Sequence, residues 1–313
     1  MGAGFEEALL NSEVEVQRQV REFYDSIGWQ EISAGVYQNA RFEDLRPVTR
    51  EYIRRCHMRV SRHLPLEGEY FLDAGSGPIQ YPEYLEYSRG YRFRVCLDLS
   101  RRALKGARER VGEHGLFVVG DIARLPFRPE IFTGAVSLHT VHHLPANQQR
   151  SAFEELYRVL EPGGHTVVVS SWGKRSLLMR ISRGPIAVAF WLLRAYRRLW
   201  GIEQVSVVPV SGEGIETSEL LKLPGTYTHQ GGFAWAKREL AFLPGLEVRV
   251  WRSVGSSFLR AFIHRRLLGS IWLKLLFWLE ERAPHTLGRL GQHPMILFNR
   301  PVQGATNVEG WLR

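Results

Sequence analysis

The stretch YFLDAGSGPIQ, residues 70–80, decides the fold. Its apolar start predicts a buried strand, with Asp73 at the carboxyl end and a tight Gly75-Ser76-Gly77 turn before a helix marked by prolines. Glycines let the backbone turn sharply and approach a ligand closely, and ligands of open α/β sheets bind at the carboxyl ends of strands. The stretch therefore predicts a nucleotide pocket.

The acid in this stretch indicates the kind of nucleotide. A dinucleotide fingerprint has its third glycine three positions after the second, where this chain carries Gln80. Asp73 precedes the first glycine by two residues, which suits a cationic amine better than a pyrophosphate. The spacing therefore disfavours a nicotinamide oxidoreductase.

Length and composition restrict the class of protein. A chain of 313 residues with 44% hydrophobic content can bury a large core, so we expect one catalytic domain with insertions. Two cysteines give neither a disulfide framework nor a zinc spacing, which fits a reducing cytoplasm. No apolar run reaches the roughly 18 residues of a membrane-spanning helix. The formal charge of +9 is compatible with nucleic acid, an anionic membrane or an acidic substrate.

A second carboxylate follows the next predicted strand. The apolar run over residues 93–97 leads to Asp98, which lies 21 residues after Gly77. An ionised carboxylate only accepts hydrogen bonds, so at a strand end it can bind both hydroxyls of a ribose. A solvated helix cap is the alternative, but the spacing favours the ribose role.

Several motifs together resemble the class I S-adenosylmethionine-dependent methyltransferases. They are the glycine turn, the strand end at Asp98, and the order "HHLP, helix, RVLEPGG, strand" that ends near Ser170. The last combination is similar to the subgroup with the quinone-biosynthesis C-methyltransferases. The resemblance covers about residues 70–170. It implies an α/β, Rossmann-like sheet of seven strands in the order 3-2-1-4-5-7-6, with S-adenosylmethionine as cofactor.

The resemblance also implies roles for individual residues. Asp73 is expected near the methionine amine, the glycine turn under the ribose and carboxylate, and Asp121 at the adenine amino group. Ile122, the next residue, is expected to pack on the adenine ring. The implied cofactor-binding residues are Asp73, Gly75, Ser76, Gly77, Asp98, Leu99, Asp121, Ile122 and Leu138.

Histidines are the candidates for a catalytic base. Methyl transfer is an in-line displacement, so the protein mainly aligns the reactants in a dry pocket, and an imidazole can take up a proton near neutral pH. If the fourth strand continued through them, His142 and His143 could not both face one pocket, and some of these histidines can be structural. The candidates are His139, His142, His143 and, in PGTYTHQGG, His229. No supporting cysteine or carboxylate cluster accompanies them, so we expect no metal.

The domain organisation follows from the position of the motifs. Residues 1–68 are predicted to form a helical cap, and residues 69–313 a methyltransferase domain with insertions at about 171–232 and 258–293. In the proteins this chain resembles, such caps fold over the cofactor and help to form the acceptor pocket. Aromatic residues are candidates for that pocket or, equally, for core and surface packing: Tyr24, Tyr37 and Tyr227.

Both insertions are basic and apolar. Residues 174–198 contain seven basic residues and no acid, interleaved with Leu, Ile, Phe and Trp. This composition is typical of an interfacial helix on anionic lipid, and also of a lid or core helix, which we favour. Mixing with large aliphatic residues disfavours nucleic acid as a partner.

The sequence therefore predicts a methyltransferase that acts on oxygen or carbon of a small or lipophilic metabolite. We expect it in the cytoplasm, and at the membrane periphery if the insertions contact lipid. The alternative is a non-catalytic, membrane-associated binding or assembly factor that retains the fold. The sequence leaves the substrate and the oligomeric state open.

Overall fold

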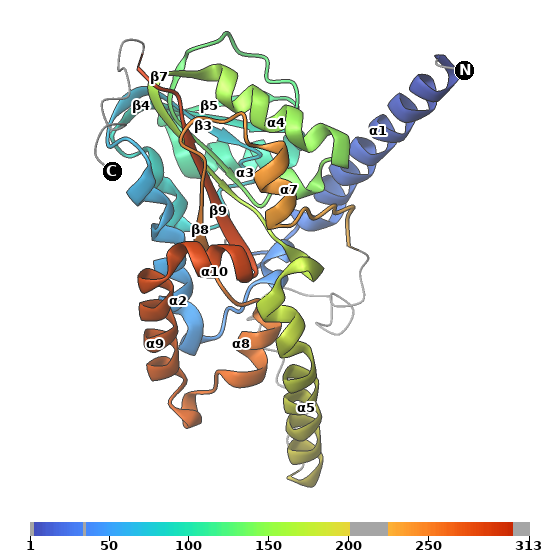
Figure 1. The fold of residues 1–313 in the computed structure, drawn as a ribbon, viewed down its shortest axis with the longest axis vertical. Helices are drawn as coiled ribbons and strands as arrows, with labels where there is room; N and C mark the ends of the chain where they lie inside the picture. The colour runs from blue at the N-terminus through green and yellow to red at the C-terminus, as the bar shows by residue number, and fades with distance from the viewer. Residues whose placement is uncertain (1–2, 34–35, 201–224, 303–313) are drawn as a thin grey trace, which may run out of the picture.

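The computed structural model describes residues 3–33, 36–200 and 225–302, and Figure 1 shows their arrangement. Seven strands form one mixed sheet in the order β5-β4-β3-β6-β7-β9-β8. They are β3 (Gly68–Ala74), β4 (Tyr91–Asp98), β5 (Gly115–Val119), β6 (Phe132–Leu138), β7 (Leu160–Val169), β8 (Glu247–Arg252) and β9 (His293–Asn299). Strand β9 is antiparallel to both of its neighbours. Numbered along the chain, the order is 3-2-1-4-5-7-6, which confirms the predicted Rossmann-like sheet.

Helices cover both faces of the sheet because side chains alternate along each strand. Phe71 of β3 belongs to an apolar cluster that includes α2, α3 and α9, whereas the next residue, Leu72, belongs to a cluster with α4 and α7. The helices are α1 (Ala3–Phe23), α2 (Pro47–Met58), α3 (Arg101–Val111), α4 (Ala146–Val159), α5 (Leu177–Leu199), α7 (Phe233–Glu239), α8 (Ser256–Phe262), α9 (Gly269–Arg282) and α10 (Pro284–Leu290).

The first strand of the sheet is longer than predicted. Strand β3 continues to Ala74, so Asp73 lies inside the strand, opposite Cys96 of β4, and not at its end. The predicted helix after the glycine turn is a 3-10 helix over Pro82–Ser88. The glycine turn itself begins at Gly75, as the sequence predicts, directly after the last residue of the strand.

The N-terminal segment is helical, as predicted, but it also contains a short ribbon. After α1 the chain forms a π-helical turn (Tyr24–Gly28), the paired strands β1 (Glu31–Ser33) and β2 (Val36–Tyr37), and a 3-10 turn (Gln38–Phe42). The sequence analysis did not predict this ribbon. It brings Trp29 against the glycine turn: a Cβ added at Gly77 would lie 2.9 Å from the Trp29 ring.

The two insertions differ in what they do. In the first, α5 projects away from the sheet as a long helix, and residues 201–224 lie outside the described residues (Figure 1). In the second, α9 packs on α2, with Leu273 and Phe277 buried. The insertions were expected to be lid or core helices or to contact lipid, and the buried inner face of α9 supports core packing.

A buried carboxylate joins α2, α9 and the end of β8. Glu280 of α9 is fully buried. Its Oε1 accepts hydrogen bonds from the Tyr52 hydroxyl (2.8 Å) and from the backbone N–H of Ser253 (2.8 Å), and its Oε2 accepts one from Arg59 (2.9 Å). Arg59 also donates to Glu281 (2.8 Å). The donors and acceptors of this network come from different elements, so their hydrogen bonds fix how α2, α9 and the end of β8 pack together.

We expect Glu280→Ala to lower the free energy of unfolding by about 3 to 5 kcal/mol. It removes the fully buried partner of the Arg59 guanidinium and the acceptor of the Tyr52 hydroxyl and the Ser253 N–H, and leaves Arg59 with the partly exposed Glu281 as its carboxylate partner. The matched control is Glu281→Ala, since this carboxylate is 36% exposed. We expect the control to cost less than about 1 kcal/mol. Urea denaturation measures both values. Equal losses in the two variants would contradict the structural role of Glu280.

Candidate active site

A cavity of about 510 Å³ lies at the carboxyl ends of β3, β4 and β6. The N-terminal segment and the segment after residue 224 complete its wall. Most of the predicted site residues line it: Tyr24, Gly75, Ser76, Gly77, Asp98, Leu99, Ile122, Leu138, His139, His142 and His143. The remaining ones, Asp73, Asp121, Tyr37, Tyr227 and His229, do not contribute to this lining.

The glycine turn is held against the end of β4. The backbone N–H groups of Gly75 and Ser76 both donate to the Leu97 carbonyl, at 2.7 and 3.1 Å. Gly75 has a φ of 76°, and a Cβ there would lie 2.3 Å from the Thr140 side chain. The turn thus requires glycine for both its conformation and its close packing.

Asp98 lies beside this turn, and the backbone orients its carboxylate. Oδ2 accepts a hydrogen bond from the Gly77 N–H (2.9 Å) and Oδ1 one from the Ser100 N–H (2.8 Å). Burial raises the pKa of Asp98 to about 6, although these two hydrogen bonds oppose the shift. Each oxygen keeps a further acceptor site, so the ionised carboxylate can still accept two hydroxyls from a ligand in the cavity.

Asp73 faces away from the cavity. It is buried and forms an ion pair with Arg94 of β4, whose guanidinium also donates to the Tyr84 carbonyl. The other oxygen of Asp73, Oδ1, has no hydrogen-bond partner in the described part of the chain. The structure therefore assigns Asp73 to the support behind the turn, and its contact with a ligand amine stays a prediction.

The end of β5 places Ile122 in the cavity wall and Asp121 behind it. Asp121 accepts hydrogen bonds from the Ala123 N–H (2.9 Å) and from the Gln17 side-chain amide of α1 (2.7 Å). Gln17 itself lines the cavity. The sequence predicts that Asp121 accepts a hydrogen bond from the adenine amino group. In the structure its carboxylate accepts one from the side-chain NH2 group of Gln17, which is a similar donor.

The chain turns sharply after β6 and presents three histidines to the cavity. The strand ends at Leu138, His139 has a φ of 57°, and a 3-10 turn covers Val141–His143. The strand does not continue through them, so the condition that would have kept His142 and His143 from facing one pocket does not apply, and both line the cavity. Burial lowers the pKa of His139 to about 3 and of His143 to about 4. These imidazoles are therefore neutral at physiological pH.

The tautomer of His143 follows from its partners. Its Nδ1 lies 2.9 Å from the Tyr227 carbonyl oxygen, which can only accept, so Nδ1 carries the proton. Its Nε2 then accepts from the Tyr24 hydroxyl at 2.8 Å. Tyr24 stacks on Trp29, and Tyr37 packs edge-to-face on the other side of Trp29. Tyr24 thus lies in the wall as predicted, and Tyr37 lies behind it.

The segment after residue 224 is extended, which explains why two predicted residues miss the cavity. Successive side chains of an extended chain point to opposite sides. Thr226, Thr228 and Gln230 line the cavity, whereas Tyr227 and His229 point away and act through their backbones. The His229 N–H donates to the His142 carbonyl (2.8 Å).

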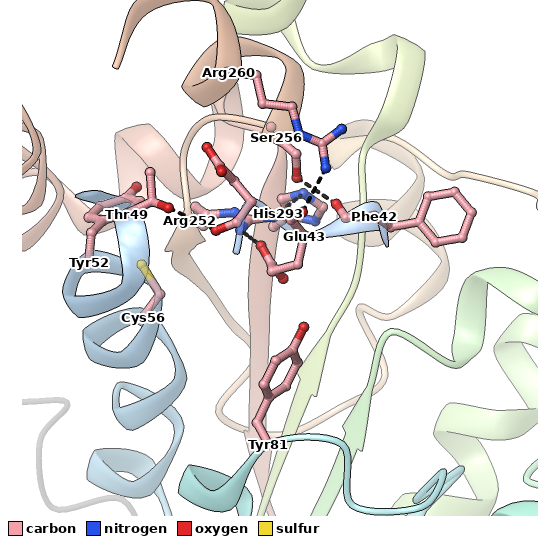
Figure 2. A network of polar contacts seen from close by, with 12 residues as sticks. Phe42, Glu43, Thr49, Tyr52, Cys56, Tyr81, Arg252, Ser256, Arg260 and His293 are labelled. Atoms are coloured by element: carbon pink, nitrogen blue, oxygen red, sulfur yellow. Dashed lines mark hydrogen bonds and ion pairs between the residues drawn. The ribbon is translucent and has the colours of Figure 1, made fainter. Parts of the chain in front are cut away.

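Sequence reasoning missed a cluster of charged and polar groups in the cavity wall. Figure 2 shows Glu43, Arg252 and His293, which come from the N-terminal segment, the end of β8 and the start of β9. Glu43 and Arg252 form an ion pair, and Arg252 Nη2 lies 3.3 Å from His293 Nε2. Burial raises the pKa of Glu43, but Arg252 and His57 outweigh it, so the net shift is downward. The sequence signal for this cluster was Arg252, which directly follows the strand-like stretch VRVW at residues 248–251.

The described residues contain no group of three or more His, Cys, Asp or Glu side chains that could hold a metal ion. The cavity wall contains the glycine turn, the carboxylates of Asp98 and Glu43, and neutral imidazoles. This is an arrangement for binding a nucleoside beside a second, partly aromatic compartment that contains one ion pair.

Comparison with known proteins assigns the central segment. Residues 72–168 match the family described as "Methyltransferase domain". A tRNA (carboxymethyluridine(34)-5-O)-methyltransferase of Arabidopsis thaliana is 35% identical over 106 residues, which are 34% of this chain and 24% of that protein. A malonyl-[acyl-carrier protein] O-methyltransferase of Salmonella typhimurium is 39% identical over 93 residues, which are 30% of this chain and 35% of that protein. The matches thus span about a quarter to a third of these relatives.

A solved structure extends the likeness to the whole fold. Phosphoethanolamine N-methyltransferase 1 of Haemonchus contortus is 11% identical, with a TM-score of 0.54, over 94% of this chain and 51% of that chain. Sheet order, glycine turn and family match agree. Residues 72–168 therefore match a methyltransferase domain, within a sheet that has the strand order of the class I S-adenosylmethionine-dependent methyltransferases, whose cofactor is S-adenosylmethionine.

We expect Gly75→Ala to weaken binding of S-adenosylhomocysteine about tenfold or more. An L-residue at this φ costs about 1 to 2 kcal/mol, and 1.4 kcal/mol corresponds to a factor of ten. The new methyl group must also displace Thr140 or the turn. Gly112→Ala is the matched control, because Gly112 has a φ of 64° with no atom within 4 Å of the added Cβ. Calorimetric titration should show unchanged affinity for S-adenosylhomocysteine in the control. A Gly75→Ala variant that binds with normal affinity would show that the turn does not need glycine at this position to bind the cofactor.

Proposed function

We propose that this protein transfers the methyl group of S-adenosylmethionine to an oxygen or carbon atom of a small or lipophilic metabolite. One observation carries the proposal: a single cavity joins the glycine turn and Asp98 to the compartment of His139 and Glu43. A cofactor bound at the first part would direct its sulfonium methyl group toward the second.

The cofactor half uses the chain's own groups as follows. Asp98 accepts the two ribose hydroxyls, the glycine turn passes under the ribose and the methionine carboxylate, and Ile122 packs on the adenine. The adenine amino group takes the Asp121 oxygen that now accepts from Gln17, so cofactor binding displaces that amide. When bound, S-adenosylmethionine supplies the activated methyl group.

We assign the role of base to His139. Both nitrogens of His143 are engaged, and the side chain of His229 does not line the cavity. His139 is neutral and lines the cavity, and within the described part of the chain no hydrogen bond engages its ring nitrogens. In transfer to a hydroxyl, the carbon–sulfur bond breaks, the carbon–oxygen bond forms, and the hydroxyl proton moves to His139. Burial disfavours the resulting imidazolium, whereas the ionised Glu43 favours it.

The wall around this compartment supports the kind of acceptor. Phe42, Tyr81 and Tyr84 line it together with the Glu43–Arg252 pair. Large aromatic surfaces favour a lipophilic or ring-containing acceptor. Both curated relatives bear names of O-methyltransferases, which supports oxygen as the acceptor atom.

The experiment is a transfer assay with labelled S-adenosylmethionine and a set of phenols, quinols, fatty acids and isoprenoid alcohols. We expect one class to gain a methyl group, with the rate strongly reduced in His139→Ala and little changed in His229→Ala. A folded protein that binds S-adenosylhomocysteine yet methylates no compound of any class would favour the non-catalytic binding factor. Equal rates in the two histidine variants would reject His139 as the base.

Cofactor affinity should depend on the charge of Asp98. Only the ionised carboxylate accepts both ribose hydroxyls, and its pKa in the free protein is raised to about 6. Affinity for S-adenosylhomocysteine should therefore be highest above pH 7 and fall as the pH drops through 6, by about tenfold between pH 8 and pH 5. Titration calorimetry at each pH measures this. Asp98→Asn should bind more weakly and without this pH dependence, and an affinity that rises toward acid pH in the unmodified protein would contradict the assignment.

A further inference from the structure

Helix α5 has an apolar face that nothing in the described structure covers. Its inner side packs on α8, with Ser182 and Ile186 each only 9% exposed. Its outer side carries Leu177, Ile181, Val188, Leu192 and Leu199, at successive spacings of 4, 7, 4 and 7 residues, with exposures from 44% to 82%. These spacings align the side chains along one stripe of the helix.

Helix α9 and the turn before it repeat this pattern. The inner side is buried against α2, whereas the outer side exposes Leu268, Trp272, Leu275 and Leu279, at spacings of 4, 3 and 4 residues. Figure 1 shows α5, α8 and α9 gathered at one end of the molecule, away from β4 and β5. Two amphipathic helices thus present their apolar stripes at the same end.

The tryptophans of the described chain follow this pattern. Every one that is more than half exposed lies on α9 or on α5 and its C-terminal cap: Trp191, Trp200, Trp272 and Trp278. Exposed clusters of this kind mark interaction surfaces, and tryptophan favours the interface between water and lipid.

The charge around these stripes identifies the partner. Residues 162–202 and 248–279 contain no acid. Exposed cations flank the apolar stripes: Lys174, Arg175, Arg180, Arg183, Arg194, Arg198, Arg265, Arg266 and Lys274. A second copy of this chain would bring like charges together, which opposes self-association through this face. An anionic lipid surface complements both the charge and the apolar stripes.

We propose that α5, α9 and the turn over residues 265–268 dock the protein on an anionic phospholipid bilayer. The apolar stripes enter the boundary between headgroups and acyl chains, and the basic side chains contact lipid phosphates. No helix of the described residues is long and apolar enough to cross a membrane, so this contact is peripheral. Ser171 lines the cavity and lies six residues before the start of α5, so the cavity is connected along the chain to one of the docking helices.

The proposal does not depend on methyl transfer, and its test is independent of turnover. The full chain is sedimented with vesicles of phosphatidylcholine alone or mixed with phosphatidylglycerol. We expect binding to the mixed vesicles, weakened by salt and accompanied by a blue shift of tryptophan fluorescence. Absence of binding at low salt, or equal binding to both kinds of vesicle, would overturn the proposal.

Two paired variants locate the contact. Trp191→Glu combined with Trp272→Glu should weaken vesicle binding about tenfold or more. The matched control, Leu66→Glu combined with Val119→Glu, adds the same charge at exposed apolar sites elsewhere and should bind as the unmodified protein does. Titration with S-adenosylhomocysteine in the absence of vesicles checks that each variant is folded. Equal binding by both variants, or a concentration-dependent dimer that buries the tryptophans without lipid, would reject this docking surface.

Discussion

The structure depends on how closely the backbone of the glycine turn approaches the carboxyl end of β4. Gly75 and Ser76 donate to the Leu97 carbonyl, and Gly77 donates to the Asp98 carboxylate. These hydrogen bonds fix the turn and the carboxylate in one geometry. The cavity opens where the sheet order reverses between β3 and β6, the place where ligands of open α/β sheets bind. A side chain at Gly75 or a shift of β4 would alter both binding groups at once.

Local sequence patterns predicted the sheet correctly and indicated which strand ends meet at the cavity, because strands, glycine turns and strand-end carboxylates act within a few residues of each other. The glycine turn, Asp98 and Ile122 lie in the cavity wall as the motifs indicate. The acceptor half was not predictable in the same way. Glu43 and Arg252 are 209 residues apart, and only the packing of the N-terminal segment on β8 and α8 brings them together.

Other features of the site depend on local backbone geometry that the sequence does not show. Asp73 lies inside β3 and pairs with Arg94, so its predicted contact with a ligand amine stays a prediction. His142 and His143 both reach the cavity because a 3-10 turn replaces the strand. Tyr227 and His229 miss it because the alternation of an extended segment selects their neighbours. The direction of each of these side chains follows from backbone geometry that the residue types alone do not show.

A crystal structure with S-adenosylhomocysteine would show directly which groups of the cavity hold the cofactor. We expect the ribose hydroxyls within hydrogen-bond distance of the Asp98 carboxylate, the adenine against Ile122, and the Gln17 amide displaced from Asp121. The sulfur atom should face the compartment of His139 and Glu43. A ligand bound outside this cavity, or with its ribose away from Asp98, would overturn the proposed cofactor site.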